Sequence, residues 1–475
     1  MKKRLVFRLF ALILTLSLLA GCVPSGQELS SAPENSASEP GSDGEAVLTL
    51  EEAAFDVYLY FFPLMLCDAI RDYLTNTVHP DADQAPENWF VHYSGPLQKE
   101  TVGMLRPNGD GLQSVAVLSL EEEPVILQVP EGEKPFYITF FDSWGDPVFT
   151  LTEPGRYLLF GTGTETAGYA VAGAKEIYLP DDRLICTALI RCDFADKANK
   201  EQAQLWQENL RVFAFSANQD TPPVGEYAEH LRFAPTKVLL QMDIAAYFDR
   251  CSALLELLPP KEIPEETKKA MDLLGISAGE KFSLEQFTFS QRVYLQTLSL
   301  TVFDDLEQWE AENRREQSGW NWQTANRELD ENRQRVLDLL YRTFEPDASV
   351  LATAYNSHDL LGKPLTGGDY LVALPVDAIP PGAEFTLSVC DTAGNPLWTS
   401  GAPCSISSKD LPVNSDGEYQ LLITTIPGKT DSLLVEEGKF MLCFRVYQCP
   451  DALLKRLKMP TITKVLPDSP GVEEF

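Results

Sequence analysis

The sequence predicts a mixed, β-rich fold in which two antiparallel β-sandwich or jelly-roll-like domains are joined by a helical connector. Two separate stretches, residues 88–191 and 367–465, consist of short apolar, β-branched runs divided by turn-forming residues. Closely spaced strands without helices between them indicate antiparallel sandwiches or barrels. Between these stretches, residues 199–341 carry apolar positions at helical spacing. The expected order is therefore helix, β domain, helical connector and second β domain.

The first domain, residues 47–198, is expected to open with a helix from about Leu50 to Asn76. Thr49 is a suitable N-cap, and two glutamates follow it in the first turn. The centre of this helix, VYLYFFPLML, is apolar on nearly every side, so the helix should be buried and should kink at Pro63. Strand-like runs such as SVAVLSL and PFYITFFD then form the first β region.

Residues 199–345 are assigned to the helical connector and residues 346–475 to the second β domain. In the connector, the run LLQMDIAAYFDRCSALLELL predicts one helix that ends before Pro259 and Pro260. Charged helices are expected at about 304–317 and 323–344. The second β domain contains the strand-like runs DYLVALP, EFTLSVCD, EYQLLITTIP and KFMLCFRVYQC.

The N-terminus predicts a lipoprotein. Residues 1–21 combine a basic start with an apolar stretch too short for a stable membrane span, as in a secretory signal peptide. The run Leu-Ala-Gly-Cys that ends at Cys22 resembles the lipobox of bacterial lipoproteins, in which the cysteine is acylated. An ordinary cleaved signal peptide is the alternative. Residues 22–46 are rich in Ser, Pro, Glu and Gly and predict a disordered tether. We therefore expect an extracytoplasmic protein whose partner is the lipid bilayer, reached through its acylated cysteine.

The formal net charge of −32 argues against nucleic acid and against docking on anionic lipid, because both require a basic face. An acidic surface is typical of a soluble, exposed protein, and a calcium-binding surface is the more specific alternative. No Cys-x-x-Cys or Cys/His spacing for zinc occurs, so we expect no metal and no cofactor.

Cys186 and Cys192, like Cys443 and Cys449, lie six residues apart in strand-like runs. An extended strand would separate each pair by roughly 20 Å, so neither pair can bridge to itself.

The stretch RPNGDGLQS, residues 106–114, looks most like a site. Asn108 and Asp110 could orient a ligand, and the glycines beside Asp110 would let another group approach its backbone closely. We expect Asp110 to face a cavity rather than bulk solvent. The alternative is a turn in which these side chains satisfy backbone donors.

Three further residues are candidates for ligand binding. His92 is the one plausible acid or base, although a structural histidine is the competing interpretation. Asp142 and Trp144 end a strand in FFDSWGDP and would suit a sugar or aromatic ligand, or else a polar turn. The glycine-rich run GTGTETAG precedes a strand-like YAVAG rather than a helix, so it predicts a hairpin turn and not a dinucleotide loop.

Arg445 and Tyr447 occupy alternate positions of the strand-like run FMLCFRVYQC and therefore share one face. An inward arginine would pair with a carboxylate such as Asp391. A structural ion pair is the favoured interpretation.

Taken in order, FFPLMLCDAI, NWFVHYSGPL, RPNGDGLQS, EEPVILQVP and PFYITFFDSWGDPV resemble bacterial domain-of-unknown-function family 1254. The later runs GDYLVALPVDAIPPGAEFTLSVCDTAGNPL, SDGEYQLLI and FMLCFRVYQCPDALL resemble its partner, family 1214. The resemblance covers roughly Leu50 to Val465. It implies two β-sandwich domains joined by helices and assigns no activity.

The chain departs from the pattern of these families at three places. Gly111 and Gln113 stand where family 1254 has Thr and Tyr, and Glu384-Phe385-Thr386 stands where family 1214 has Phe-Trp-Ser. Residues 431–434 replace an Asn-Trp-Leu-Pro element. Because the Thr and Tyr hydroxyl donors are lost at Gly111 and Gln113, we expect this protein to retain ligand binding better than catalysis.

The leading hypothesis is a lipoprotein that binds a small or carbohydrate-like ligand. The alternatives are a hydrolase with Asp110, Asp142 and His92 around one cleft, and a structural envelope protein without a cleft.

Overall fold

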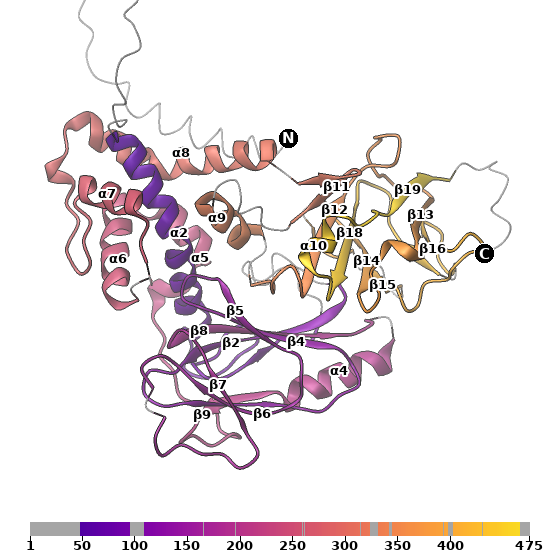
Figure 1. The fold of residues 1–475 in the computed structure, drawn as a ribbon, viewed down its shortest axis with the longest axis horizontal. Coiled ribbons are helices and arrows are strands. Elements are labelled where there is room, and N and C mark those ends of the chain that lie inside the picture. Colours follow the sequence, from indigo (N-terminus) through magenta and orange to yellow (C-terminus); the bar gives the residue numbers. More distant parts are fainter. Residues whose placement is uncertain are drawn as a thin grey trace, which may run out of the picture. The chain divides into compact units, whose positions relative to one another are not determined.

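The helices and strands follow the expected order of helix, β domain, helices and β domain (Figure 1). The structure is a computed structural model. It describes residues 48–95, 109–164, 166–194, 196–258, 260, 262–313, 315–323, 331–341, 344–392, 394–397, 402–429 and 431–465. The predicted signal peptide, Cys22 and the tether, as well as Asn108, lie outside these residues. The predicted β-rich architecture of two β domains is confirmed.

Helix α2 (Leu50–Thr75) begins where its N-cap predicts. The Thr49 side chain accepts a hydrogen bond from the Glu52 backbone N–H, and the Glu52 carboxylate accepts one from the Thr49 backbone N–H at 2.9 Å. This reciprocal pair is a capping box, which satisfies two otherwise orphaned donors. Pro63 lies inside the helix, which is continuous through it.

Helix α2 is buried because other helices surround it. It packs against α5 (Pro235–Gln241), α6 (Ile244–Leu257), α7 (Glu265–Leu274), α8 (Phe289–Asn313) and α9 (Glu331–Tyr341). Tyr58 and Tyr247 stack with ring centroids 4.2 Å apart. Among the described residues, α2 is long and apolar enough to cross a membrane, yet 78% of its apolar window is buried inside the protein. We therefore describe it as the core helix of the helical region.

The first β domain has two sheets. One has the strand order β1 (Val91–His92), β2 (Gly111–Ser119), β8 (Arg183–Arg191), β4 (Phe136–Phe141) and β5 (Pro147–Leu151). The other has the order β7 (Lys175–Tyr178), β6 (Gly155–Phe160), β3 (Val125–Val129) and β9 (Arg211–Ala214). Strand β2 is buried on both faces: Ala116 belongs to the core between the sheets, and Val115 to the core around α2. Burial on both faces explains its nearly continuous apolar sequence.

The second β domain also has two sheets. The larger has the order β10 (Glu316–Gln317), β11 (Trp320–Trp322), β12 (Leu351–Asn356), β18 (Met441–Tyr447), β14 (Glu384–Cys390) and β15 (Ser405–Ser407). The smaller has the order β17 (Ser432–Leu434), β16 (Glu418–Thr424), β13 (Tyr370–Pro375) and β19 (Thr461–Lys464). Trp320, Phe385 and Phe444 pack in the core of this domain.

The boundaries of the helical connector differ from the predicted ones. After α4 (Lys197–Asn209), strand β9 pairs with β3, so the first β domain extends to Ala214 rather than ending at residue 198. Strands β10 and β11 lie within the predicted connector but join the second β domain, because β11 pairs with β12. The helix expected over residues 239–258 is two helices, α5 and α6, because Asp243 caps a new helix at its N-terminus.

Among the described strands, two pairs are parallel within the otherwise antiparallel sheets, namely β6 with β7 and β16 with β17. The predicted hairpin at GTGTETAG is therefore wrong, since the segment connects two parallel strands. Parallel strands require a longer crossover than a hairpin provides. The YAVAG run (residues 169–173), expected as a strand, is irregular, and Tyr169 and Val171 pack with Phe215 against a small apolar cluster.

Candidate functional site

The Gly109–Asp110–Gly111 segment leads into strand β2 and lies against both β domains. A Cβ atom at Gly109 would be 3.0 Å from Cys404 Sγ and 3.2 Å from Pro396 Cβ. A Cβ atom at Gly111 would be 2.6 Å from the Ile190 carbonyl oxygen. Position 111 therefore requires glycine, as predicted from close approach, and at position 109 a larger residue would fit only if Cys404 and Pro396 gave way by a few tenths of an ångström. The groups that approach are protein groups of strand β8 and the second domain.

The Asp110 carboxylate is buried at 4% exposure and receives three polar groups from the second domain. Arg445 Nη1 lies 3.1 Å from one oxygen, while Thr386 Oγ1 and the Tyr447 hydroxyl donate to the other at 2.6 and 2.5 Å. Arg445 and Tyr447 share a face of β18, and Thr386 of β14 pairs directly with Arg445. A buried charge is stable only when it is paired and hydrogen-bonded, as here.

The electrostatics of this cluster keep Asp110 ionised. Burial raises the pKa of its carboxyl group, but the Arg445 and Arg191 cations and the hydrogen bonds from Thr386 and Tyr447 outweigh burial and lower the pKa below its ordinary value. Burial and the Asp110 carboxylate raise the pKa of Tyr447, so its hydroxyl remains a donor.

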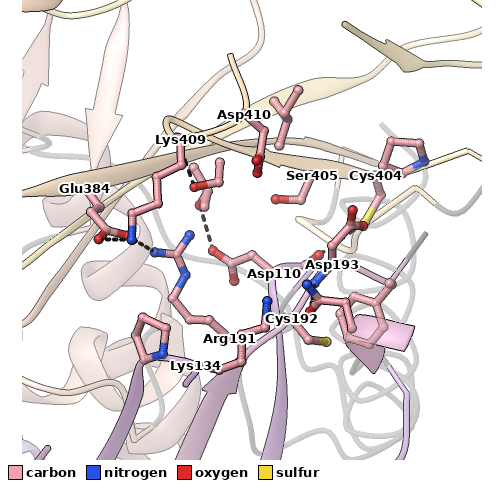
Figure 2. A pocket seen from close by; sticks show the side chains of 18 of the residues that line it. Asp110, Lys134, Arg191, Cys192, Asp193, Glu384, Cys404, Ser405, Lys409 and Asp410 are labelled. Carbon is pink, nitrogen blue, oxygen red and sulfur yellow. Dashed lines mark hydrogen bonds and ion pairs between the residues drawn. The ribbon is translucent and has the colours of Figure 1, made fainter. Parts of the chain in front are cut away.

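A second group of charges borders the first. Arg191, at the end of β8, forms an ion pair with Glu384 at 2.9 Å, and Lys409 approaches the same carboxylate at 2.5 Å (Figure 2). The Arg191 guanidinium also lies over the Tyr447 ring, 4.3 Å from its centroid. Since Arg191 comes from the first domain and Glu384 from the second, this ion pair connects the two domains, as the Asp110 cluster does.

These residues line a cavity of about 510 Å³. Asp110, Lys134, Arg191 and Asp193 contribute from the first domain, and Glu384, Ser405, Lys409 and Asp410 from the second (Figure 2). This volume lies within the usual range for small-molecule sites, roughly 300–1,000 Å³. About half of the wall is polar, and that half carries carboxylates, ammonium groups and hydroxyls. Such a wall can orient a hydrophilic ligand through several hydrogen bonds at once.

Of the other sequence candidates that the structure describes, His92, Asp142 and Trp144 do not line this cavity. His92 Nδ1 lies 2.9 Å from Ser114 Oγ, and its ring stacks on Phe90. Burial and Arg211 lower the pKa of His92 to about 4, so the imidazole is neutral at physiological pH. The expected arrangement of Asp110, Asp142 and His92 around one cleft is thus not found among the described residues.

Asp142 forms the turn after β4. Its carboxylate accepts hydrogen bonds from the backbone N–H groups of Trp144 at 2.9 Å and Asp146 at 3.0 Å. The Trp144 ring packs against Tyr60 and Phe61 of α2, with centroid distances of 5.3 and 6.1 Å. The structure thus favours the polar turn, with a tryptophan anchored in the core, over a ligand platform.

The sequence interpretation missed Arg191, Glu384, Thr386 and Lys409. The available signal was the alternation in EFTLSVC, where Glu384, Thr386 and Ser388 share a polar strand face opposite Phe385 and Leu387. Such a face usually meets solvent, and the sequence cannot show that it meets another domain.

The eight described cysteines are all buried free thiols.

The fold and the cavity define a protein of two β domains joined by helices, with a polar cavity lined by both domains. The model of one family, described as "Protein of unknown function (DUF1254)", matches residues 87–213, which cover most of the first β domain. No curated protein matches the chain.

Two solved structures are similar. The VPA0106 protein from Vibrio parahaemolyticus is 15% identical, with a TM-score of 0.63 over 88% of this chain and 100% of that chain. This likeness shows a shared fold across both domains. A putative uncharacterized protein from Burkholderia cenocepacia is 11% identical, with a TM-score of 0.42 over 88% of this chain and 93% of that chain.

Proposed function

We propose that this protein is a membrane-anchored, extracytoplasmic lipoprotein that binds a small, carbohydrate-like ligand in the cavity lined by its two β domains. The observation that carries the proposal is the cavity of about 510 Å³, whose wall presents charged and hydroxyl groups from both domains. Sugars are recognised by many directional hydrogen bonds, and carboxylates, amides and hydroxyls provide them. Asn199 and Phe194, which also line the cavity, would add an amide and an aromatic surface.

The positions at which this chain differs from the family 1214 pattern also point to this cavity as the binding site. Glu384 and Thr386, and likewise Asp431 and Ser432, stand where the pattern of family 1214 differs, and all four line the cavity. Substitutions grouped around one cavity are expected when relatives bind different ligands. The family model matches residues 87–213. We extend the assignment to a second domain similar to family 1214 because the later sequence runs resemble that family.

The cavity favours binding over catalysis. Asp110 is ionised, buried and held by Arg445, Tyr447 and Thr386, which leaves it poorly suited to accept or donate a proton. Neither His92 nor Asp142 lies in the cavity wall. The hydrolase alternative therefore has no geometric support among the described residues, and we do not propose it.

Filling the cavity tests the proposal. Ser407→Trp would place an indole in the cavity, whereas Ser415→Trp would place one on an exposed turn of the same domain. The full-length protein, purified in detergent, is screened by thermal shift and saturation-transfer NMR against a panel of mono- and disaccharides. We expect Ser407→Trp to abolish the response to sugars that bind, and Ser415→Trp to retain it. Sugar binding that survives Ser407→Trp contradicts the proposed site, and the absence of binding across the panel contradicts the proposed function.

The anchor is tested separately. Cys22→Ala removes the thiol that acylation requires, so we expect unprocessed precursor or released protein in fractionation and gel-mobility experiments. A Cys67→Ala variant is the matched control, because Cys67 is a buried thiol of α2. If Cys22→Ala protein matures and fractionates with membranes as the native protein does, the lipoprotein proposal is wrong.

A further inference from the structure

The charges of the cavity are separated by depth. Among the lining residues, Glu133, Asp193, Asp410 and Asp431 are exposed, and they form a mainly acidic rim in which Lys409 is an exposed cation. Lys134, Arg191 and Lys429 are buried or half-buried, and they place positive charge on the inner wall. The distribution is therefore not a uniform acidic surface, in spite of the strongly acidic chain.

The inner carboxylates are already neutralised. Asp110 is paired with Arg445, and Glu384 is shared between the two cations Arg191 and Lys409. Lys134 and Lys429 make no ion pair within the part of the chain that the structure describes, and one comes from each domain. The inner wall therefore has an excess of positive charge.

Arg191 provides a second, independent observation. Its side chain lines the cavity and is 8% exposed, and its Nε–H is buried without a hydrogen-bond acceptor among the described residues. Figure 2 shows this side chain between Asp110, Glu384 and Lys134. A buried donor without an acceptor destabilises the fold unless a ligand or water supplies one. A carboxylate oxygen is well suited, since a hydrogen bond between two charged groups is among the strongest in proteins.

We infer that the ligand is an acidic sugar whose carboxylate lies against Arg191, Lys134 and Lys429, while its hydroxyl groups contact the serines and rim carboxylates. Ser405, Ser407 and Ser432 line the second-domain side of the cavity. Rim carboxylates accept hydrogen bonds from sugar hydroxyls, and they repel polyanions, which selects a ligand of low charge. This inference rests on the proposed function and specifies the substrate class of the same site.

Three probes separate the parts of the inference. Galacturonate and galactose differ only in the carboxylate at one carbon, and succinate carries carboxylates without a sugar ring. Binding to the full-length protein in detergent is measured by calorimetry and saturation-transfer NMR. We expect galacturonate to bind at least about tenfold more tightly than galactose, as a charge-assisted hydrogen bond of about 1.5–3 kcal/mol implies. Succinate should bind more weakly than galacturonate.

Matched variants locate the carboxylate. Lys134→Gln and Lys429→Gln should each weaken galacturonate binding about threefold to tenfold and leave galactose binding unchanged. Lys281→Gln makes the same charge change on an exposed residue that does not line the cavity, and it should have no effect. Galacturonate binding that Lys134→Gln and Lys429→Gln leave unchanged overturns the inference.

The remaining outcomes separate the inference from the proposed function. Equal binding of galactose and galacturonate overturns the acidic-sugar inference and leaves sugar binding intact. Succinate that binds as tightly as galacturonate shows an anion site without sugar specificity, which also overturns the inference. If neither sugar binds and the wider saccharide panel is also silent, the proposed function falls as well.

Discussion

Asp110 and Asp142 are both largely buried aspartates at turns of the first β domain, yet the pKa values of their carboxyl groups shift in opposite directions. The pKa of Asp110 is lowered, because two arginines and two hydroxyl donors outweigh its burial. The pKa of Asp142 is raised to about 6, because burial and the neighbouring Asp146 outweigh its two backbone hydrogen bonds. Burial alone therefore does not decide whether a buried carboxyl group is ionised, because the charged and hydrogen-bonding partners brought close by folding also shift its pKa.

The two shifts give opposite dependences of stability on pH. The lowered pKa of Asp110 means that its ion pair stabilises the fold above about pH 4 and that this stability is lost as pH falls through the folded-state pKa. The raised pKa of Asp142 means that the folded state favours the protonated carboxyl group. Its contribution is therefore present below about pH 4 and is lost as pH rises through about 6.

Removing the partner of Asp110 should have the largest effect. Arg445→Met leaves a buried carboxylate without its cation, so we expect a loss of about 3–5 kcal/mol in the free energy of unfolding, measured by chemical denaturation. The double variant Asp110→Asn with Arg445→Met should recover part of this loss, because no buried charge then remains unpaired. A single variant as stable as the native protein would falsify the view that Arg445 sets the ionisation of Asp110.

Crowding the Asp110 loop should have the next largest effect. In Gly109→Ala the new methyl group would lie 3.0 Å from Cys404 Sγ, so the Cys404 side chain must move aside in a tightly packed region, at an expected cost of about 1–3 kcal/mol. Gly95 is the control, because nothing lies within 4 Å of a Cβ atom there and Gly95→Ala should be nearly neutral. Adding Cys404→Ala to Gly109→Ala should restore part of the stability. No recovery in denaturation experiments would show that the contact with Cys404 is not the cause.

Asp142→Asn should change stability in the opposite direction. The amide oxygen can still accept the hydrogen bonds from Trp144 and Asp146, and the repulsion from Asp146 disappears. After allowance for partial solvent screening, we expect a gain of about 1 kcal/mol at pH 7.5 and almost none at pH 4.5. Melting temperatures measured across this pH range test the sign. A gain that is equal at both pH values contradicts a carboxyl group that titrates near 6.

His92 should show the smallest effect. Its pKa of about 4 means that it does not titrate between pH 5 and 8, and it lies outside the cavity wall. We therefore expect His92→Gln to change sugar binding by less than about twofold. The matched cavity variant Arg191→Gln should reduce the binding of an acidic sugar at the same pH. A large loss of sugar affinity in a folded His92→Gln variant would show that His92 contributes to the binding site.

The local features of this protein can be predicted from its sequence. The capping box at Thr49 fixes the start of α2, and the uniformly apolar centre of that helix requires burial. The glycines beside Asp110 allow other protein groups to approach its backbone closely. Alternation along β18 placed Arg445 and Tyr447 on one face. These features depend on residues within a few positions of one another, so their physical causes are visible in the sequence.

The tertiary structure decided which groups meet. Asp110 and Arg445 are 335 residues apart, and no local pattern indicates that the Arg445 guanidinium neutralises the Asp110 carboxylate. Likewise, β9 pairs with β3 and β11 pairs with β12, although helical segments flank β9 and β11 in sequence. These pairings depend on backbone hydrogen bonds to strands that are distant in sequence. The opposite ionisation of Asp110 and Asp142 has the same origin. Each pKa depends on charges brought close by folding, and Coulomb energy depends on distance in space rather than on separation in sequence.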